Sequence, residues 1–272
     1  MRYGLDVPVS GEYADPRLLA EMAADAEDAG WDGFFLQDVL HTADPVAEPW
    51  ISLAAVALRT QRLRIGIMLT PLARRRPWQV ARQAATIDNL SRGRLVFGAG
   101  LGYSSVDFTP FGEEWDGRVR AGKLDEALEI VIGLWSGEPY SFAGVHHRLD
   151  DVVMRPAPTQ SPRIPVWAAA GWPRRRPIER AARWDGVYLM TVHQDTRELL
   201  TPADVAAAVA ALRAAGSRPG FDIAFNTERQ GDVAEQVHAF AAAGGTWWIE
   251  LADDKGGPKA YRERMRNGPP VA

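Results

Sequence analysis

The stretch "LRIGIMLTPLARRRPWQVARQAATIDNLSRGRLVFGAGLG" (residues 63–102) decides the fold. It begins with a strand-like apolar run (63–70), continues with a helical pattern (77–91) and ends with a second strand-like run (94–100) that finishes in glycine. Two parallel strands can be joined only by a long crossover connection, usually a helix. The stretch therefore predicts one parallel βαβ unit.

The same alternation of strand-like and helical patterns extends over the whole chain of 272 residues. Eight repeats at this length favour a closed (β/α)8 TIM barrel over an open doubly wound sheet. No linker interrupts the pattern, so we expect a single domain over residues 1–272. The expected strands are 2–8, 32–38, 63–70, 94–100, 164–170, 185–190, 221–226 and 246–251.

The ends of several helices are visible in the sequence. Asp15, Thr201 and Asp232 each stand in an N-cap position, and proline follows the first two at the first helical position. Two long irregular stretches, 102–116 and 137–163, follow the fourth strand and its helix. We expect both at the C-terminal face of the barrel, where active sites of this fold are built.

The glycines of "GRLVFGAGLG" (93–102) raise a different possibility, the phosphate-binding turn of a dinucleotide-binding fold. That fingerprint needs Gly-x-Gly-x-x-Gly and an immediate helix, whereas this chain has Gly98, Gly100 and Gly102, followed by loop residues. A Rossmann site is therefore disfavoured. Tight packing of strand ends at a barrel rim also explains such glycines.

Composition excludes several classes of protein. The net charge is −4, so no general field attracts nucleic acid, and the chain has no cysteine for disulfides, thiolate catalysis or a Cys-ligated zinc. Neither a signal peptide nor a membrane-spanning apolar run is visible, and we expect a cytoplasmic protein without a membrane partner. The adjacent His146 and His147 point apart on extended backbone, so we predict no metal site.

Five segments together resemble the luciferase-like flavin-dependent monooxygenases and oxidoreductases, a TIM-barrel family. The most specific is 63–102, because strand, "TPL", basic loop, helix, "LSRGR" and glycine-ended strand follow in family order. The others are "AEDAGWDGFFLQD" (26–38), "FGEEWDGRVRAGKLDEALEIVIGLWSGEPYSF" (111–142), "IPVWAAAGWP" (164–173) and "RAARWDGVYLM" (180–190).

The resemblance implies a flavin-type ring at the ends of strands three and four. In the family the third strand commonly ends in a non-prolyl cis peptide that supports the ring, which here falls within Ile67, Met68 and Leu69. Gly98, Gly100 and Gly102 are expected to let the backbone approach the cofactor. Leu101 stands where bacterial luciferase-like members have a phosphate-binding arginine.

For the cofactor phosphate we expect the loop after strand five. It offers backbone groups of Ala170, Gly171 and Trp172, with Arg174 and Arg175 at a helix start, and Trp172 is the tryptophan expected near the ring. A solvated basic turn is the alternative. For the other basic run, Arg74 to Arg76, contact with the cofactor tail, a solvated helix start and a subunit contact all remain open.

Three residues are candidates for proton transfer. Deazaflavin-dependent members that oxidise sugars or alcohols often carry Asp-His at the end of strand two, whereas this chain has Asp38 followed by Val39, and its nearest histidine is His41. His193, just after strand six, has equal weight as an acid or base. Asp107 in the loop after strand four either shapes a substrate lid or is simply exposed.

The resemblance implies an FMN-dependent oxidoreductase or monooxygenase of a small organic substrate, with NAD(P)H or a flavin reductase as electron donor. The alternative is hydride transfer with the deazaflavin coenzyme F-420. A barrel aldolase or hydrolase and a non-catalytic flavin-binding protein are less favoured. Homodimerisation through helices 48–59 and 77–91 is common in the family, and both helices carry enough apolar residues for it.

Overall fold

In a computed structural model, which describes residues 1–192, 199–229, 231–252 and 256–270, eight parallel strands close into one barrel. The order around the barrel is β1-β10-β9-β8-β7-β4-β3-β2, and β2 pairs with β1 to close it. All eight predicted barrel strands are confirmed. They are β1 (Arg2–Val7), β2 (Gly33–Leu36), β3 (Arg64–Pro71), β4 (Leu95–Gly100), β7 (Val166–Trp172), β8 (Gly186–Thr191), β9 (Asp222–Thr227) and β10 (Trp247–Leu251).

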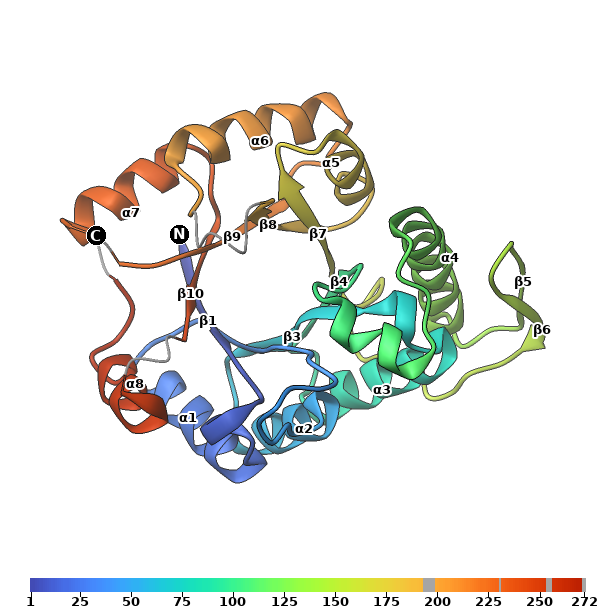
Figure 1. Cartoon of the computed structure of the whole chain (residues 1–272), viewed down its shortest axis with the longest axis horizontal. Coiled ribbons are helices and arrows are strands. Elements are labelled where there is room, and N and C mark those ends of the chain that lie inside the picture. The colour runs from blue at the N-terminus through green and yellow to red at the C-terminus, as the bar shows by residue number, and fades with distance from the viewer. Residues whose placement is uncertain (193–198, 230, 253–255, 271–272) are drawn as a thin grey trace.

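Helices surround this ring of strands (Figure 1). The predicted N-caps are confirmed, since the side chains of Asp15, Thr201 and Asp232 each accept hydrogen bonds from backbone N–H groups of the first turn. Within the described ranges no helix combines the length and the apolar character needed to cross a membrane. The helices are α1 (Pro16–Asp28), α2 (Pro49–Arg59), α3 (Pro77–Leu90), α4 (Gly117–Trp135), α5 (Arg175–Ala181), α6 (Pro202–Ala214), α7 (Val233–Ala242) and α8 (Gly257–Met265).

The segment between α4 and β7 differs from the prediction. Instead of an irregular loop at the C-terminal face, it contains an antiparallel hairpin of β5 (Tyr140–Ala143) and β6 (Arg148–Val152), which lies outside the barrel beside α4 (Figure 1). The segment leaves the C-terminal end of α4, so it is an αβ connection and starts from the opposite face of the barrel. The prediction for 137–163 was wrong, because two strands this short give no clear alternating pattern.

Side chains of the barrel strands alternate between the barrel interior and the helices. Phe35, Met68, Trp167, Tyr188 and Trp247 share one interior cluster. The neighbour of Trp247, Trp248, instead packs among side chains of α6 and α7. The prediction that the two adjacent tryptophans face opposite sides of the last strand is therefore confirmed.

The N-terminal face of the barrel is held by a buried arginine. Arg94 donates hydrogen bonds to the carbonyl oxygens of Ala57, Thr60, Leu63 and Ser91, at 2.8–3.0 Å, and to the Thr60 hydroxyl at 2.8 Å. These acceptors come from the end of α2, the start of β3 and the turn after α3. One guanidinium thus holds the "LSRGR" turn and fixes where β4 begins beside β3.

Candidate active site at the C-terminal face of the barrel

A non-prolyl cis peptide joins Met68 to Leu69 near the end of β3. The bond falls within the three residues for which the resemblance predicted it. Met68 points into the barrel interior and Leu69 packs partly against the same cluster, whereas Ile67 belongs to the outer core. The pairing of β3 with β4 shifts register at this place, between Ile67 and Thr70.

The inner wall beside this peptide carries almost no side chains. Gly98 and Gly100 of β4 and Ala169 and Gly171 of β7 occupy its inward positions. A Cβ atom on Gly98 would lie 2.2 Å from the carbonyl oxygen of Ile67, so no side chain fits there. On Gly100 it would lie 3.1 Å from Leu69 Cβ, which is tighter than ordinary packing. Tight strand packing therefore requires glycine at position 98 whether or not a ligand is bound.

This bare wall fits a flat aromatic ring. The four inward positions leave backbone and one methyl group on the wall, and Leu69 and Met190 border it as partly buried apolar side chains. A planar ring can therefore approach the partly exposed Ala169 and Gly171, whereas Gly98 and Gly100 are buried against Met68 and Leu69. The residues present are compatible with a flavin or a deazaflavin.

The exit of β7 agrees with the prediction only in part. Ala170 and Trp172 point away from the barrel interior, because they alternate with Ala169 and Gly171, and both pack in the outer cluster with α5 and α6. The Trp172 side chain is only partly buried in that cluster, and the expectation of a ring near it stays a prediction.

The basic residues after β7 lie on the surface at the first turn of α5. The Arg174 amide donates to the carbonyl of Gly171 at 2.9 Å. The Arg175 side chain is 89% exposed and its Nε donates to Glu179 at 2.7 Å. These arginines border the mouth without reaching into it, which is compatible with binding a phosphate tail.

The exit of β4 is covered by the protein itself. Leu101 packs against the outer core, and Gly102, with a φ of +90°, lies against the ring of Phe108. Arg120 of α4 donates to the carbonyl oxygens of Leu101 and Gly102 at 3.2 and 3.1 Å. Arg120 therefore does not take the place of the phosphate-binding arginine that the resemblance expects at position 101, because its guanidinium is hydrogen-bonded to the backbone.

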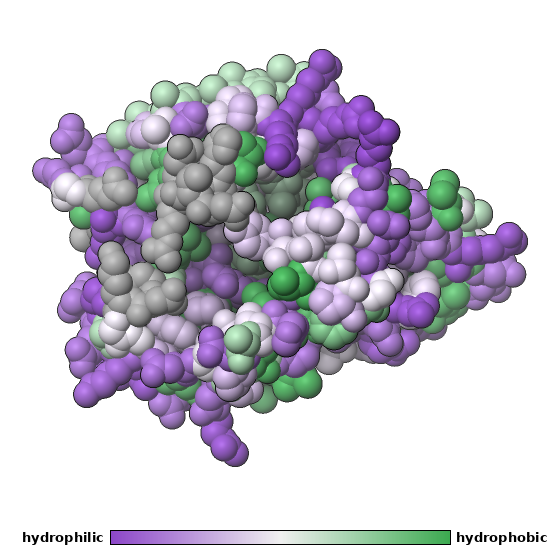
Figure 2. All heavy atoms as spheres, viewed as in Figure 1, coloured by the Kyte–Doolittle hydropathy of each residue, from purple (hydrophilic) through white to green (hydrophobic). Residues whose placement is uncertain are grey.

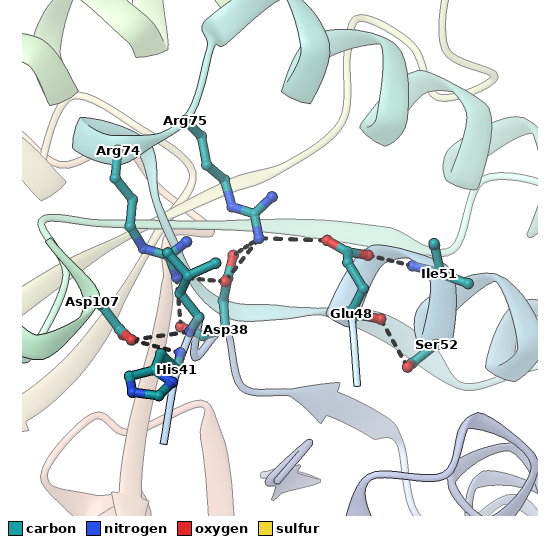
Figure 3. A network of polar contacts seen from close by, with 9 residues as sticks. Asp38, His41, Glu48, Ile51, Ser52, Arg74, Arg75 and Asp107 are labelled. Atoms are coloured by element: carbon teal, nitrogen blue, oxygen red, sulfur yellow. Dashed lines mark hydrogen bonds and ion pairs between the residues drawn. The ribbon is translucent and has the colours of Figure 1, made fainter. Parts of the chain in front are cut away.

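Asp38 follows β2 and lies in a buried ion-pair network with Arg74 and Arg75 (Figure 3). Arg74 and Arg75 each place Nη2 2.8 Å from Asp38 Oδ1, and Arg75 also approaches Glu48 at 3.5 Å. The Asp38 side chain is fully buried and that of Arg74 is 4% exposed. Of the three alternatives left open for this basic run, a solvated helix start does not hold for these two arginines. Asp38 pairs with both of them, and Glu48 lies near Arg75 as a second carboxylate.

His41 lies on the loop after β2 at the C-terminal face. Its backbone N–H and that of Leu40 both donate to Asp107 Oδ1 at 3.1 Å, and the ring lies 6.3 Å from that of Phe111 (Figure 3). Asp107 is buried, so it joins two loops and is not merely exposed. His193 lies outside the described residues. The catalytic roles of His41 and His193 stay predictions.

The histidine pair at the tip of the β5–β6 hairpin has a structural role. Backbone N–H groups of Val145, His146 and His147 donate to the carboxylate of Glu126 at 2.6–3.2 Å. Burial is the main cause that lowers the pKa of His147, although Glu126 opposes it. Among the described residues no cluster of three metal-ligating side chains occurs.

Asp6 is a buried carboxyl group inside the barrel that the sequence did not predict as a site residue. Asp6 of β1 accepts a hydrogen bond from the Tyr188 hydroxyl of β8 at 2.7 Å, across the strands β10 and β9. Its other oxygen, Oδ1, has no hydrogen-bond partner among the described residues. Burial raises the pKa of Asp6 to about 7, against the opposing effect of the Tyr188 and Gln37 side chains. An acidic residue in an otherwise apolar strand, "RYGLDVP", is the signal that could have found it.

Residues 4–244 match the family model described as luciferase-like monooxygenase. The chain belongs to this family. Among curated members, the F420-dependent glucose-6-phosphate dehydrogenase of Nakamurella multipartita is 34% identical over 172 residues, which is 60% of this chain and 49% of that protein. The phthiodiolone/phenolphthiodiolone dimycocerosates ketoreductase of Mycobacterium kansasii is 32% identical over 66% of this chain and 47% of its own. This luciferase-like chain spans about half the length of the curated relatives it matches.

Solved structures of the luciferase-like fold superpose along the whole chain. The monooxygenase RslO1 from Streptomyces bottropensis matches with a TM-score of 0.77 and 21% identity, over 98% of this chain and 97% of its own. An F420-dependent secondary alcohol dehydrogenase in complex with an F420-acetone adduct matches with a TM-score of 0.76 and 18% identity, covering 96% and 97%. At these identities the comparison establishes the fold.

The Asp6 carboxyl predicts an unusual pH dependence of stability. Its pKa in the folded protein, about 7, lies above its ordinary value of 3.8, so the folded state holds the proton more tightly than the unfolded state. This contribution is complete below pH 4 and is lost as the pH rises to 7, at about 1.4 kcal/mol per pKa unit and therefore about 4 kcal/mol at most. In Asp6→Asn the contribution is absent.

The measurement is urea unfolding of wild type and Asp6→Asn at pH 4 to 8. The stability of the variant relative to wild type should rise with pH over this range. Asp88→Asn, at a buried aspartate of α3 that accepts hydrogen bonds from Gln160, is the control. Parallel stability curves for wild type and Asp6→Asn would contradict the assignment.

Proposed function

We propose that this protein is an oxidoreductase that transfers a hydride between coenzyme F-420 and a small organic alcohol or carbonyl compound. The observation that carries the proposal is the wall of small residues, Ala169 and Gly171, beside Leu69 and the Met68–Leu69 cis peptide. It offers a flat, apolar seat at the C-terminal mouth, the place where barrels of this kind do their chemistry.

The relatives support F-420 over FMN. Several curated relatives at 31–34% identity are named F420-dependent glucose-6-phosphate dehydrogenases. A solved structure that contains FMN, a Baeyer-Villiger monooxygenase, is more distant, at 13% identity. The order of preference expected from the sequence is thus reversed. In this proposal the substrate or the reduced coenzyme supplies the electrons, and neither NAD(P)H nor a reductase takes part.

The coenzyme supplies a ring carbon that accepts or donates a hydride. The protein positions the ring through the backbone at Met68 and Leu69 and through the wall of β4 and β7. Backbone groups near Gly171 and the guanidinium of Arg174 are proposed to hold the phosphate.

The protein must also exchange the proton of the substrate hydroxyl. Val39 stands where relatives that oxidise alcohols carry histidine, and Asp38 is occupied by Arg74 and Arg75. We assign this exchange to Asp6, because it combines an unpaired Oδ1 with a pKa near 7. Tyr188 holds the carboxyl by its hydrogen bond. His41 and His193 are the alternatives.

Binding of F-420 and its reduction test the proposal. The visible absorption of F-420 should bleach when the protein and an alcohol substrate are present, in air as well as under nitrogen, because hydride transfer needs no oxygen. In Ala169→Phe the added ring would fill the seat, and the affinity for F-420 should fall at least 100-fold. Ala210→Phe, on the exposed side of α6, is the control and should bind as wild type does.

Tight FMN binding with oxygen consumption, and no bleaching of F-420, would contradict the proposal and favour a monooxygenase. Equal F-420 affinity in wild type and Ala169→Phe would contradict the proposed seat.

We further propose that the protein forms a homodimer through α2 and α3. Ile51 and Leu58 are each 68% exposed and, being seven residues apart, lie on the same side of α2. Ile51→Arg together with Leu58→Arg should convert a dimer into a monomer in sedimentation equilibrium. A wild-type protein that sediments as a monomer at micromolar concentration would exclude the dimer.

A further inference from the structure

We propose that the active site takes an apolar alcohol or ketone, whose hydrocarbon part packs on a surface formed by the loops after β2 and β4. This inference rests on the proposed function and names its substrate class. The surface consists of Leu40, Tyr103, Val106 and Phe111, and is called the apolar rim below.

The apolar rim is exposed although its side chains are large. Leu40 is 43%, Val106 49%, Phe111 53% and Tyr103 63% exposed. Both loops follow strand ends at the C-terminal face, and Figure 2 shows hydrophobic atoms beside a hollow near the middle of the face seen there. Scattered apolar side chains are ordinary on a surface, but several on two adjoining loops at one mouth indicate a contact site.

A buried carboxylate holds the two loops together. Asp107 is 7% exposed, and its Oδ1 accepts from the backbone N–H groups of Leu40 and His41 (Figure 3). Because Val106 precedes Asp107 in the chain and Phe111 lies against the His41 ring, the two loops present one continuous rim. The rim is therefore built by specific bonds and does not arise from loose loops.

Three arginines near these loops already have ion-pair or hydrogen-bond partners, whereas the exposed Arg76 lines a separate pocket with Leu40. Arg74 and Arg75 pair with Asp38, and Arg120 donates to three backbone carbonyls while its guanidinium lies 3.6 Å from the Trp115 ring centre. A phosphate ester placed on this side would find no free guanidinium among these three. Arg174 follows β7, the strand next to β4, and it is there that we place the coenzyme phosphate.

The polar and apolar requirements of the reaction thus fall on different loops of the mouth, the phosphate after β7 and the hydrocarbon chain after β4 and β2. In the oxidative direction, the carbinol carbon loses a hydride to the coenzyme, the hydroxyl loses its proton to Asp6, and the C–O bond becomes a carbonyl. The hydrocarbon chain beyond that carbon then extends over the apolar rim.

A homologous series of substrates tests this inference. With F-420 bound, kcat/KM should rise from 2-propanol to 2-octanol by about 4-fold per methylene group over the part of the chain that reaches the rim, from about 0.8 kcal/mol per buried methylene. Glucose 6-phosphate should be at least 100-fold poorer than the best alcohol. Saturation-transfer NMR should also show 2-octanone binding to the protein without coenzyme.

Variants locate the effect. Phe111→Ser and Val106→Ser should flatten the dependence on chain length with little change for 2-propanol, and should weaken 2-octanone binding. Val145→Ser, at a 90% exposed valine on the β5–β6 hairpin, is the matched control and should leave the series unchanged.

A flat series in wild type, a preference for glucose 6-phosphate, or an unchanged slope in Phe111→Ser would each overturn the inference while the proposed function stands. A change of oligomeric state in Phe111→Ser without a change of slope would also overturn it, because the rim would then cover a second copy of the chain. Failure to reduce F-420 with any alcohol or sugar would overturn the proposed function itself.

Discussion

The close approach of β3 to β4 at the C-terminal mouth is the constraint on which the site depends. The carbonyl oxygen of Ile67 occupies the space of a Cβ atom on Gly98, and Leu69 restricts that of Gly100. These strands can pack in this way only if the inward positions of β4 carry no side chain. The same packing places Met68 and Leu69 against the two glycines, so the proposed seat for a flat ring lies beside them, at the partly exposed Ala169 and Gly171.

The two ends of the barrel have different tasks. At the N-terminal face, Arg94 donates hydrogen bonds to backbone carbonyl oxygens, and Glu27 of α1 accepts hydrogen bonds from the backbone N–H groups of residues 61–63. At the C-terminal face, Asp6 keeps an unpaired oxygen, glycines replace side chains, and apolar residues remain exposed. The hydrogen bonds at the N-terminal face hold the strands in place. The C-terminal face can therefore keep a carboxyl oxygen without a partner and exposed apolar side chains, both of which a ligand can contact.

The barrel could be predicted from the sequence because its signals are local and repeated. Each strand is a short apolar run, and caps such as Asp15 and Thr201 mark helix starts through bonds to the next turn. The cis peptide could be placed because the order of motifs in 63–102 is specific to the family. The β5–β6 hairpin could not, because its strands are short and lie on the surface.

The site was less predictable, because it depends on which way side chains point and on partners distant in sequence. Simple alternation along β7 would have placed Trp172 outside and Ala169 inside, had the register been known. Asp38 stands at a position that the resemblance marks as functional, but its side chain pairs with Arg74 and Arg75. The hydrogen-bond partner of Asp6, Tyr188, is 182 residues away in the sequence. Strand alternation reveals inward positions, whereas pairings across the barrel need the three-dimensional structure.

A crystal structure of the protein with F-420 tests the central claim most directly. We expect the deazaflavin ring to lie against Leu69, Ala169 and Gly171, with the Met68–Leu69 peptide behind it. A ring bound elsewhere, for example in the 450 Å³ pocket between Leu40, Arg76 and Val80 outside the barrel, would contradict it.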